Sequence, residues 1–307
     1  MKTVKISKIN LIAIASVIFF SLSVWSASAQ RMQKPKNELS IDVGGGWAAF
    51  HLQPSVDNAS SGGYSVDAGG GFTGFLSPHW GLHVGAGIGI FNVKNKVNQF
   101  SFITNDQVDC EGYLNDLYTT LNEYKETHQA FFLRIPLMLQ FQTKMGQSFH
   151  WKKQQKVGYY AMAGVKAQFL VNYRYTAEIA SLYNKAYYPD FNNWIDLQPA
   201  LGLGAFDGNS ASGKLDFNIL AMLALETGAK WRLNDHIFLY TGIYFDYGLN
   251  DPTQKSRKPY SNYNTPEELE NLTLLAYTDR MHLMEAGIKL RFAFTRYSRP
   301  LGCPAFN

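Results

Sequence analysis

The sequence predicts an all-β chain, an eight-stranded antiparallel up-and-down transmembrane β-barrel. Three observations lead to this fold class. Only 17% of the 307 residues are charged, whereas a soluble domain carries about 25%. Runs in which apolar and polar side chains alternate recur through the chain, as in strands with two different faces. The connections between these runs alternate between short and long, which is typical of barrels with turns at one end and loops at the other.

The first residues have the features of an export signal. Three lysines precede an apolar run over residues 11–25. Ala27 and Ala29 then supply the small side chains that signal peptidase recognises, so we expect cleavage before Gln30 and a signal peptide over residues 1–29. An uncleaved membrane anchor is the alternative, because the apolar run is long. After Gln30 no window reaches the ~20 consecutive apolar residues of a spanning helix.

Eight alternating runs follow, each bounded by Gly, Asn, Asp or Pro. The predicted strands cover residues 38–51, 63–76, 80–94, 129–143, 157–175, 215–233, 237–250 and 281–294. Several are long enough for the tilted spans of ~9–11 residues, plus extensions, that a membrane barrel uses. The connections after the second, fourth and sixth strands are short or moderate and cover residues 77–79, 144–156 and 234–236. The other connections are longer and cover residues 52–62, 95–128, 176–214 and 251–280.

The two faces of each run have the chemistry of a barrel in lipid. In the last predicted strand Ile288, Leu290 and Phe292 share one face, and Lys289 and Arg291 share the other. A closed barrel satisfies every backbone hydrogen bond while its apolar face contacts lipid, so we expect the charged face to line the lumen. The short turns then lie in the periplasm and the long loops outside the cell.

Glycines and aromatic residues occupy positions that fit this arrangement. Glycines on the inward parity of the first three strands leave room for longer side chains that cross the lumen. They are Gly44, Gly46, Gly69, Gly71, Gly85, Gly87 and Gly89. Aromatic residues near strand ends are expected to form girdles at the two membrane interfaces. They are Trp47, Tyr64, Trp80, Tyr159, Tyr173, Trp231 and Tyr247.

The inward parity also carries a nearly balanced set of charges. The acids are Asp42, Asp67, Glu226, Asp246 and Glu285, and the bases are Arg134, Lys166, Lys230, Arg232, Lys289 and Arg291. With eight strands the lumen is only wide enough for side chains to fill it, and buried charges require partners. We therefore expect a self-neutralising, structural network of ion pairs. A gated narrow pore for ions is the alternative.

The last third of the chain resembles a known family. Residues 226–233 read ETGAKWRL, residues 239–249 read LYTGIYFDYGL, and residues 286–294 read AGIKLRFAF. Together with the export signal and the eight strands, these segments resemble the OmpA/PorT-like outer-membrane β-barrel proteins of Gram-negative bacteria, in their barrel domain only. The resemblance implies a barrel over residues 30–294 in the cell outer membrane, where it contacts membrane lipid after insertion by the barrel-assembly machinery.

The resemblance also implies a non-catalytic role, either structural support of the outer membrane or interaction at the surface through the long loops. A narrow channel, or a transport or secretion accessory barrel as in the PorT-like branch, is the alternative. No segment is left for the peptidoglycan-binding domain of many OmpA-like proteins, so wall tethering is not expected. Residues 295–307 form a periplasmic tail, and either Phe294 or Phe306 serves as the assembly signal.

Catalytic residues, metals and cofactors are not expected. An enzyme at the barrel rim is a third interpretation, and its catalytic group would include one of the seven histidines. They are His51, His79, His83, His128, His150, His236 and His282. His51 can approach Asp246 or a loop acid, but no spacing requires it. No residue set has metal-ligand spacing, no glycine-rich loop before a helix indicates a nucleotide, and the charges nearly balance without the leader, so no nucleic-acid partner is expected.

The long loops carry whatever specificity the chain has. A helix is predicted in the second long loop from apolar residues at helical spacing, and a second helix start at residues 267–270 after Pro266. The first set is Leu114, Leu117, Leu121 and Tyr124. Aromatic residues of the third long loop are expected to form a lid over the barrel mouth or to bind a surface partner or glycan. They are Tyr183, Tyr187, Tyr188, Phe191 and Trp194. Cys110 and Cys303 are expected on opposite sides of the membrane, too far apart for a disulfide.

Overall fold

The computed structural model describes residues 37–53, 59–109, 111–143, 156–214, 219–234, 236–251 and 280–295. The predicted signal peptide, the tail beyond Thr295, the predicted helix start after Pro266, His150 and both cysteines lie outside the described residues. The chain divides into two compact units, residues 1–34 and residues 35–307, and every described residue belongs to the second unit.

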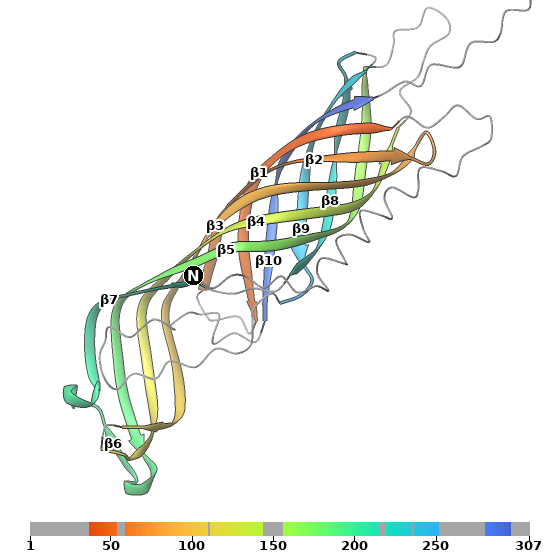
Figure 1. Cartoon of the computed structure of the whole chain (residues 1–307). Helices are drawn as coiled ribbons and strands as arrows, with labels where there is room; N and C mark the ends of the chain where they lie inside the picture. Colours follow the sequence, from red (N-terminus) through yellow and green to blue (C-terminus); the bar gives the residue numbers. More distant parts are fainter. Residues whose placement is uncertain are drawn as a thin grey trace, which may run out of the picture. The chain divides into compact units, whose positions relative to one another are not determined.

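Eight strands close into an antiparallel barrel, which confirms the predicted fold class. They are β1 (Glu38–Gln53), β2 (Ala59–Phe75), β3 (Trp80–Val108), β4 (Leu114–Gln142), β5 (Val157–Tyr188), β8 (Leu220–Arg232), β9 (Ile237–Gly248) and β10 (Arg280–Thr295). The first and last strands close the ring, because β1 pairs with both β2 and β10. Each of the eight pairs with its neighbours along the chain, and β8 follows β5 in the ring (Figure 1).

Short turns join strands at one end of the barrel, which we call the turn end. In the turn between β8 and β9 the Asn234 side chain accepts hydrogen bonds from the backbone amides of His236 (2.8 Å) and Ile237 (2.7 Å). Such local bonds are the reason that Asn is favoured in turns. The opposite end, which we call the loop end, carries the connections between β1 and β2 and between β9 and β10, and the distal parts of β3, β4 and β5.

An apolar belt covers the outside of the barrel. On β10 Ile288 and Leu290 are 65% and 41% exposed, whereas Lys289 between them is only 4% exposed. The other barrel strands alternate in the same way, for example β1 with Leu39 and Ile41 exposed. An apolar outside around a charged inside is stable in lipid rather than in water, so these strands form a membrane-spanning barrel.

Aromatic residues mark both edges of the belt. Trp47 and Tyr64 lie opposite each other in the β1–β2 ladder at the loop end, and exposed aromatic residues at the turn end are Trp80, Tyr159 and Trp231. Tyr247 lies half-buried at the loop end, stacked on His282 with ring centroids 5.5 Å apart. The predicted girdle position of Tyr173 is wrong, because a register shift in the β4–β5 ladder at Phe131 turns the later residues of β5 over. Tyr173 is therefore buried.

Three barrel strands continue past the belt at the loop end and form a further sheet. β3, β4 and β5 are 29, 29 and 32 residues long, and the distal part of β5 also pairs with β6 (Asn193–Ile195) and β7 (Gly204–Lys214). We call this region the platform, and define it as residues 98–109, 111–124 and 176–214. Its buried face has a hydrophobic core of its own, which includes Phe102, Leu121 and Leu182.

The helix predicted from Leu117, Leu121 and Tyr124 is wrong, because these residues lie on β4. Odd-numbered residues are buried up to Leu121, and even-numbered residues from Tyr124 onward. Glu123 between them has a positive φ of 48° and lies at a break in the pairing with β3 and with β5. The register of pairing is the same on both sides of Glu123, so no residue is inserted. The positive φ of Glu123 exchanges the two faces of the strand, and this exchange rather than a helix produces the three-residue step from Leu121 to Tyr124.

The third predicted loop is also mostly strand. Within residues 176–214, β5 runs to Tyr188. The short 3-10 turn η2 (Pro189–Phe191) joins β5 to β6, and a second one, η3 (Pro199–Leu201), joins β6 to β7. Tyr188 is buried in the platform core, so the aromatic cluster belongs to the layers of the platform rather than to an irregular lid. Among the described residues, no helix has the length and apolar character needed to cross a membrane.

Candidate functional site

The lumen is filled by ion pairs, and the first set lies near the turn end. Lys230 donates to Glu38 (2.6 Å) and to the side-chain oxygen of Gln142 (2.8 Å). The hydroxyl of Tyr240 donates to the second carboxylate oxygen of Glu38 at 2.5 Å. Glu38 is missing from the predicted lumen charges, although it shares the parity of Asp42 and its position at the start of the strand was visible in the sequence.

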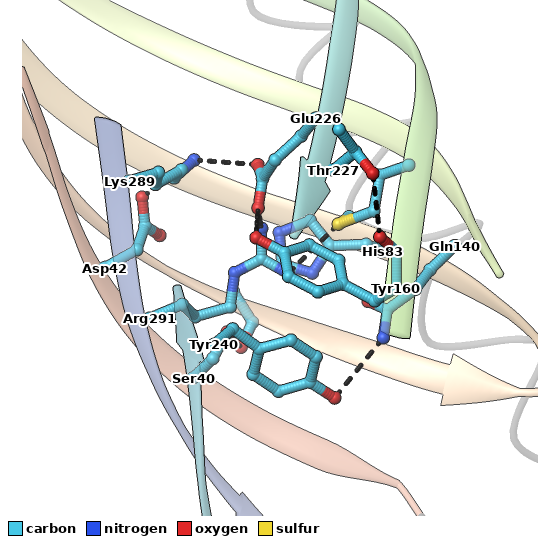
Figure 2. Close-up of polar contacts among 12 residues, drawn as sticks. Ser40, Asp42, His83, Gln140, Tyr160, Glu226, Thr227, Tyr240, Lys289 and Arg291 are labelled. Atoms are coloured by element: carbon cyan, nitrogen blue, oxygen red, sulfur yellow. Dashed lines mark hydrogen bonds and ion pairs between the residues drawn. The ribbon is translucent and has the colours of Figure 1, made fainter. Parts of the chain in front are cut away.

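The second set is centred on Glu226 in the middle of the barrel (Figure 2). Arg291 donates to one of its carboxylate oxygens at 2.5 Å, and the Tyr160 hydroxyl donates to the same oxygen at 3.0 Å. Lys289 lies 3.6 Å from the other oxygen. Glu226 is fully buried with its partners, so one carboxylate from β8 holds together side chains from β5 and β10.

Asp42 links this set to the opposite wall of the barrel. It lies 3.0 Å from Lys289 and 3.0 Å from Arg134. Arg134 also pairs with Asp67. Three acids and two bases from five strands thus form a continuous chain across the lumen when Glu226 is included.

The third set lies nearer the loop end. Lys166 contacts both carboxylate oxygens of Asp246, at 2.6 and 2.8 Å. Glu285 is buried beside it and accepts a hydrogen bond from Gln168 at 3.4 Å. Arg232, the remaining base of the predicted network, is half-buried where β8 ends, with its guanidinium 5.9 Å from the Phe238 ring. Arg232 lies at the turn end of the barrel, where none of the described carboxylates is within ion-pair distance of its guanidinium.

Inward glycines make room for these long side chains. A Cβ placed on Gly44 lies 3.0 Å from the Asp67 carboxylate, and one placed on Gly87 lies 3.1 Å from the Arg134 guanidinium. Both distances are shorter than an ordinary van der Waals contact, so the ion pair of Arg134 with Asp67 requires small residues on the facing strands.

Apolar layers lie on either side of the charges. Towards the loop end a buried cluster includes Phe50, Phe91 and Phe132. Towards the turn end a second cluster includes Met138 and Phe238. The charged layer is thus enclosed between two packed layers, and the arrangement as a whole has the character of a core rather than of a water-filled pore.

The tip of the β3–β4 hairpin is organised by Asp109. Its carboxylate accepts hydrogen bonds from the backbone amides of Glu111 and Tyr113, both at 2.9 Å, and from the Tyr188 hydroxyl at 2.9 Å. Burial by itself would raise the pKa of this carboxyl, but the hydrogen bonds to its charged form outweigh burial and lower the pKa below its usual value. Asp109 thereby ties the hairpin to β5.

The outer face of the platform carries an aromatic cluster. The Trp194 ring lies 4.8 Å from the Tyr118 ring and 5.0 Å from the Tyr187 ring. The ammonium of Lys185 stands over Trp194 at 4.8 Å from the ring centroid, within the range of a cation–π contact. Trp194 remains 48% exposed, so this cluster forms part of a surface that a partner can reach.

The histidines do not assemble into a catalytic group among the described residues. His51 lies opposite His282 in the β1–β10 ladder, away from Asp246, which is buried against Lys166. His128 contacts the Tyr173 hydroxyl at 2.5 Å and Glu126 at 3.6 Å, with side chains that are 0% exposed in the His128–Glu126 pair.

The remaining histidines bind locally. His83 bonds the Thr73 hydroxyl at 2.9 Å in the lumen, and His79 bonds the carbonyl of Gln142 at 3.0 Å. His236 follows Asn234 in the turn between β8 and β9. No group of three or more His, Cys, Asp or Glu side chains in the described part of the chain could hold a metal ion.

Comparison with protein-family models and with curated proteins finds no match for this chain. Among solved structures, the chain is similar to the outer membrane protein OprG of Pseudomonas aeruginosa, with 13% identity and a TM-score of 0.35, over 87% of this chain and 100% of that chain. It is similar to Ail, the attachment invasion locus protein of Yersinia pestis, with 10% identity and a TM-score of 0.26, over 85% and 99%. It is also similar to the outer membrane protease OmpT of Escherichia coli, with 8% identity and a TM-score of 0.30, over 88% and 100%. Likeness at this level carries no functional argument, and the assignment of the barrel rests on the strand pairing of this chain.

Proposed function

We propose that this chain is a non-catalytic outer-membrane β-barrel protein that acts through interactions of its platform at the cell surface. The observation that carries the proposal is the continuation of three barrel strands past the apolar belt into a sheet with its own hydrophobic core. Ordering so many residues beyond the belt costs conformational entropy, so we infer that the ordered platform has a role of its own. Binding residues concentrate on segments that a rigid scaffold positions, and the platform is such a segment.

The outer membrane is the location that these features support. The apolar belt requires lipid, and the predicted signal peptide over residues 1–29 directs the chain out of the cytoplasm. The OmpA/PorT-like resemblance agrees with both. In this setting the barrel-assembly machinery inserts the chain, the turn end lies in the periplasm, and the platform projects outside.

Two other readings receive less support. A narrow channel requires a continuous water column, whereas the lumen holds buried ion pairs between two apolar layers. An enzyme at the rim requires an accessible catalytic group, whereas His128 with Glu126 is fully buried and His51 is far from Asp246 in the pairing. An accessory barrel of the PorT-like kind differs from our proposal in its partner, which would be another envelope protein.

The first part of the test concerns sidedness. A membrane-impermeant maleimide added to intact cells should label Cys110, which lies between Asp109 and Glu111 of the platform hairpin. Labelling only after the outer membrane is opened would place the platform in the periplasm and contradict the surface role.

The second part identifies what the platform contacts. A photoreactive amino acid at Ile103 or Tyr183, on the outer face of the platform, should crosslink to a protein or glycan on intact cells. The matched position is Leu39 in the apolar belt, which should crosslink to lipid. Bilayer recordings from the purified protein should show no large, stable conductance. Large conductance without platform crosslinks would favour the channel, and crosslinks to a partner in the envelope would favour the accessory barrel.

A further inference from the structure

The outward face of β3 changes from apolar to basic where the belt ends. Ile88 and Ile90 are 51% and 48% exposed within the belt. Lys94 and Lys96 lie on the same face, four and six residues after Ile90, and both are exposed. In the β2–β3 ladder the girdle residue Tyr64 lies opposite Asn92, so these lysines lie directly beyond the girdle.

The neighbouring strands add further cations at the same level. Lys125 of β4 lies directly opposite Lys96 of β3, and Arg174 of β5 lies directly opposite Lys214 of β7. All four side chains are exposed. Like charges directly opposite each other destabilise a sheet, so these two pairs weaken the protein unless an anion lies between or upon them.

We define the basic patch as Lys94, Lys96, Lys125, Arg174 and Lys214. Glu178 lies opposite Lys125 in the β4–β5 ladder, but none of the five cations forms an ion pair with a carboxylate of the described residues. Strands are about 4.8 Å apart and alternate residues along one strand about 6.7 Å apart. The patch on β3, β4, β5 and β7, which lie side by side, therefore measures roughly 15 Å in each direction.

We propose that the basic patch binds the phosphate groups of a phosphorylated glycolipid in the outer leaflet, while the acyl chains of that lipid lie on the apolar belt. This inference rests on the proposed placement of the barrel in the outer membrane. The patch continues the same outward face as Ile90 on β3 and Phe131 on β4, so its occupant is both apolar and anionic. Phosphate is a favourable partner, because Lys and Arg form short charge-assisted hydrogen bonds to it.

The test measures binding of lipid A to the purified full-length mature protein in neutral detergent micelles. Lipid A that carries its phosphates should bind, and the same glycolipid without phosphates should bind much more weakly. Each Lys or Arg near an anionic surface contributes on the order of a fivefold change in affinity. The combined variant Lys94→Gln, Lys96→Gln and Lys125→Gln should therefore bind phosphorylated lipid A roughly a hundredfold more weakly.

The matched control is Arg280→Gln. Arg280 is an exposed cation at the loop end, but it lies on β10 opposite Gln53 of β1, away from the basic patch. This variant should bind phosphorylated lipid A with the affinity of the wild type. A loss on the order of fivefold in Arg280→Gln, the same loss per removed charge as in the triple variant, would indicate diffuse attraction by net charge and would overturn the assignment to the patch.

The effect of Lys96→Gln on the unfolding temperature should change sign when lipid A is added, and this change distinguishes lipid binding from a purely structural role. In neutral micelles Lys96→Gln removes the repulsion by Lys125, so its unfolding temperature should equal or exceed that of the wild type. With phosphorylated lipid A present its unfolding temperature should fall below that of the wild type, because the variant loses a lipid contact. The same order in both conditions would overturn the inference.

Two further outcomes distinguish the causes of failure. Insertion of the wild type into phosphatidylcholine vesicles, measured as heat-modifiable gel mobility and protection from trypsin, tests the barrel placement alone. Insertion without any preference for phosphorylated over dephosphorylated lipid A overturns this inference and leaves the proposed function standing; failure to insert overturns both. Equal binding of soluble inorganic polyphosphate would assign the patch to a soluble polyanion and overturn the lipid assignment.

Discussion

The barrel and the platform share three strands, β3, β4 and β5, but have opposite insides. In the barrel, β4 turns Arg134 inward and Leu133 outward. In the platform, the same strand turns Leu121 inward and Asn122 towards the surface. The exchange occurs at Glu123, a residue with positive φ that lies beyond the end of the apolar belt. The same strand therefore has its apolar face outward where lipid surrounds it and inward where water surrounds it, because an apolar outside is stable in lipid and an apolar inside is stable in water.

The charged lumen and the apolar platform core stabilise the protein in different ways. In the barrel, charges that lipid would not tolerate are neutralised against each other inside, around Glu226 and Asp42. In the platform, the core of Leu121 and its neighbours works as in a soluble protein. Substitutions of one chemical type should therefore have different effects in the two regions.

The largest expected effect is the loss of a lumen acid. Glu226→Gln keeps the volume but leaves Arg291 and Lys289 without this carboxylate, and breaking a buried ion pair costs about 3–5 kcal/mol. The free energy of unfolding, measured by urea titration in vesicles, should fall by this amount. The control is Glu178→Gln on the exposed face of the platform, which should change stability by at most about 0.5 kcal/mol. Similar losses for both glutamates would remove the distinction between the two regions.

The next effect concerns the platform core. Leu121→Ala deletes a buried side chain and should destabilise the platform by about 2–5 kcal/mol. Hydrogen exchange should increase in platform peptides, while peptides of β9 and β10 keep their protection. Exchange that increases equally in β9 and β10 would show that platform and barrel unfold as one unit.

A charge on the apolar outside should then separate the surfaces. Leu290→Arg places a cation in lipid near the middle of β10, where it costs about 2–4 kcal/mol. Ile103→Arg places the same cation at an exposed isoleucine of the platform, which faces water, and should cost at most about 0.5 kcal/mol. Unfolding titrations in vesicles measure both.

An additional lumen variant checks the register of β10. Lys289→Gln, one residue from Leu290, keeps the approximate volume inside the barrel. It leaves Asp42 paired with Arg134 and Glu226 paired with Arg291, so it should perturb assembly less than Leu290→Arg. If Lys289→Gln impairs assembly and Leu290→Arg does not, the outward and inward faces are interchanged.

The smallest effect is at the hairpin tip and depends on pH. Because the folded-state pKa of Asp109 lies below the usual 3.8, its charged form stabilises the platform above that value, and this contribution is lost as the pH falls through the lower folded-state pKa. Asp109→Asn should lower the stability of the platform by about 1 kcal/mol at neutral pH. The stability of this variant should also fall less than that of the wild type as the pH is lowered. Hydrogen exchange of the platform peptides at several pH values measures both; an unchanged acid response would contradict the role of Asp109.

The alternating pattern made most of the barrel predictable. Side chains one residue apart point to opposite faces of a strand, so Lys289 and Leu290 could be assigned to lumen and lipid without knowing their partners. The same rule failed where the backbone changes parity: Tyr173 was expected in a girdle, and Leu121 with Tyr124 was expected on a helix. The bulge at Val171 and the positive φ of Glu123 each change parity through one residue's backbone, and neither valine nor glutamate is a residue type that signals such a change.

By itself, the sequence determined the fold class, the faces of the barrel strands and the chemical type of the lumen, because these follow from a local period of two and from the balance of charge. Only the tertiary structure decided which charges meet, such as Lys230 with Glu38, since strands distant in sequence come together through barrel closure and register. It also decided that residues 98–109, 111–124 and 176–214 form a platform. The basic patch has the same origin: Lys96 and Lys125 are separate residues along the chain, and strand pairing alone places their charges side by side.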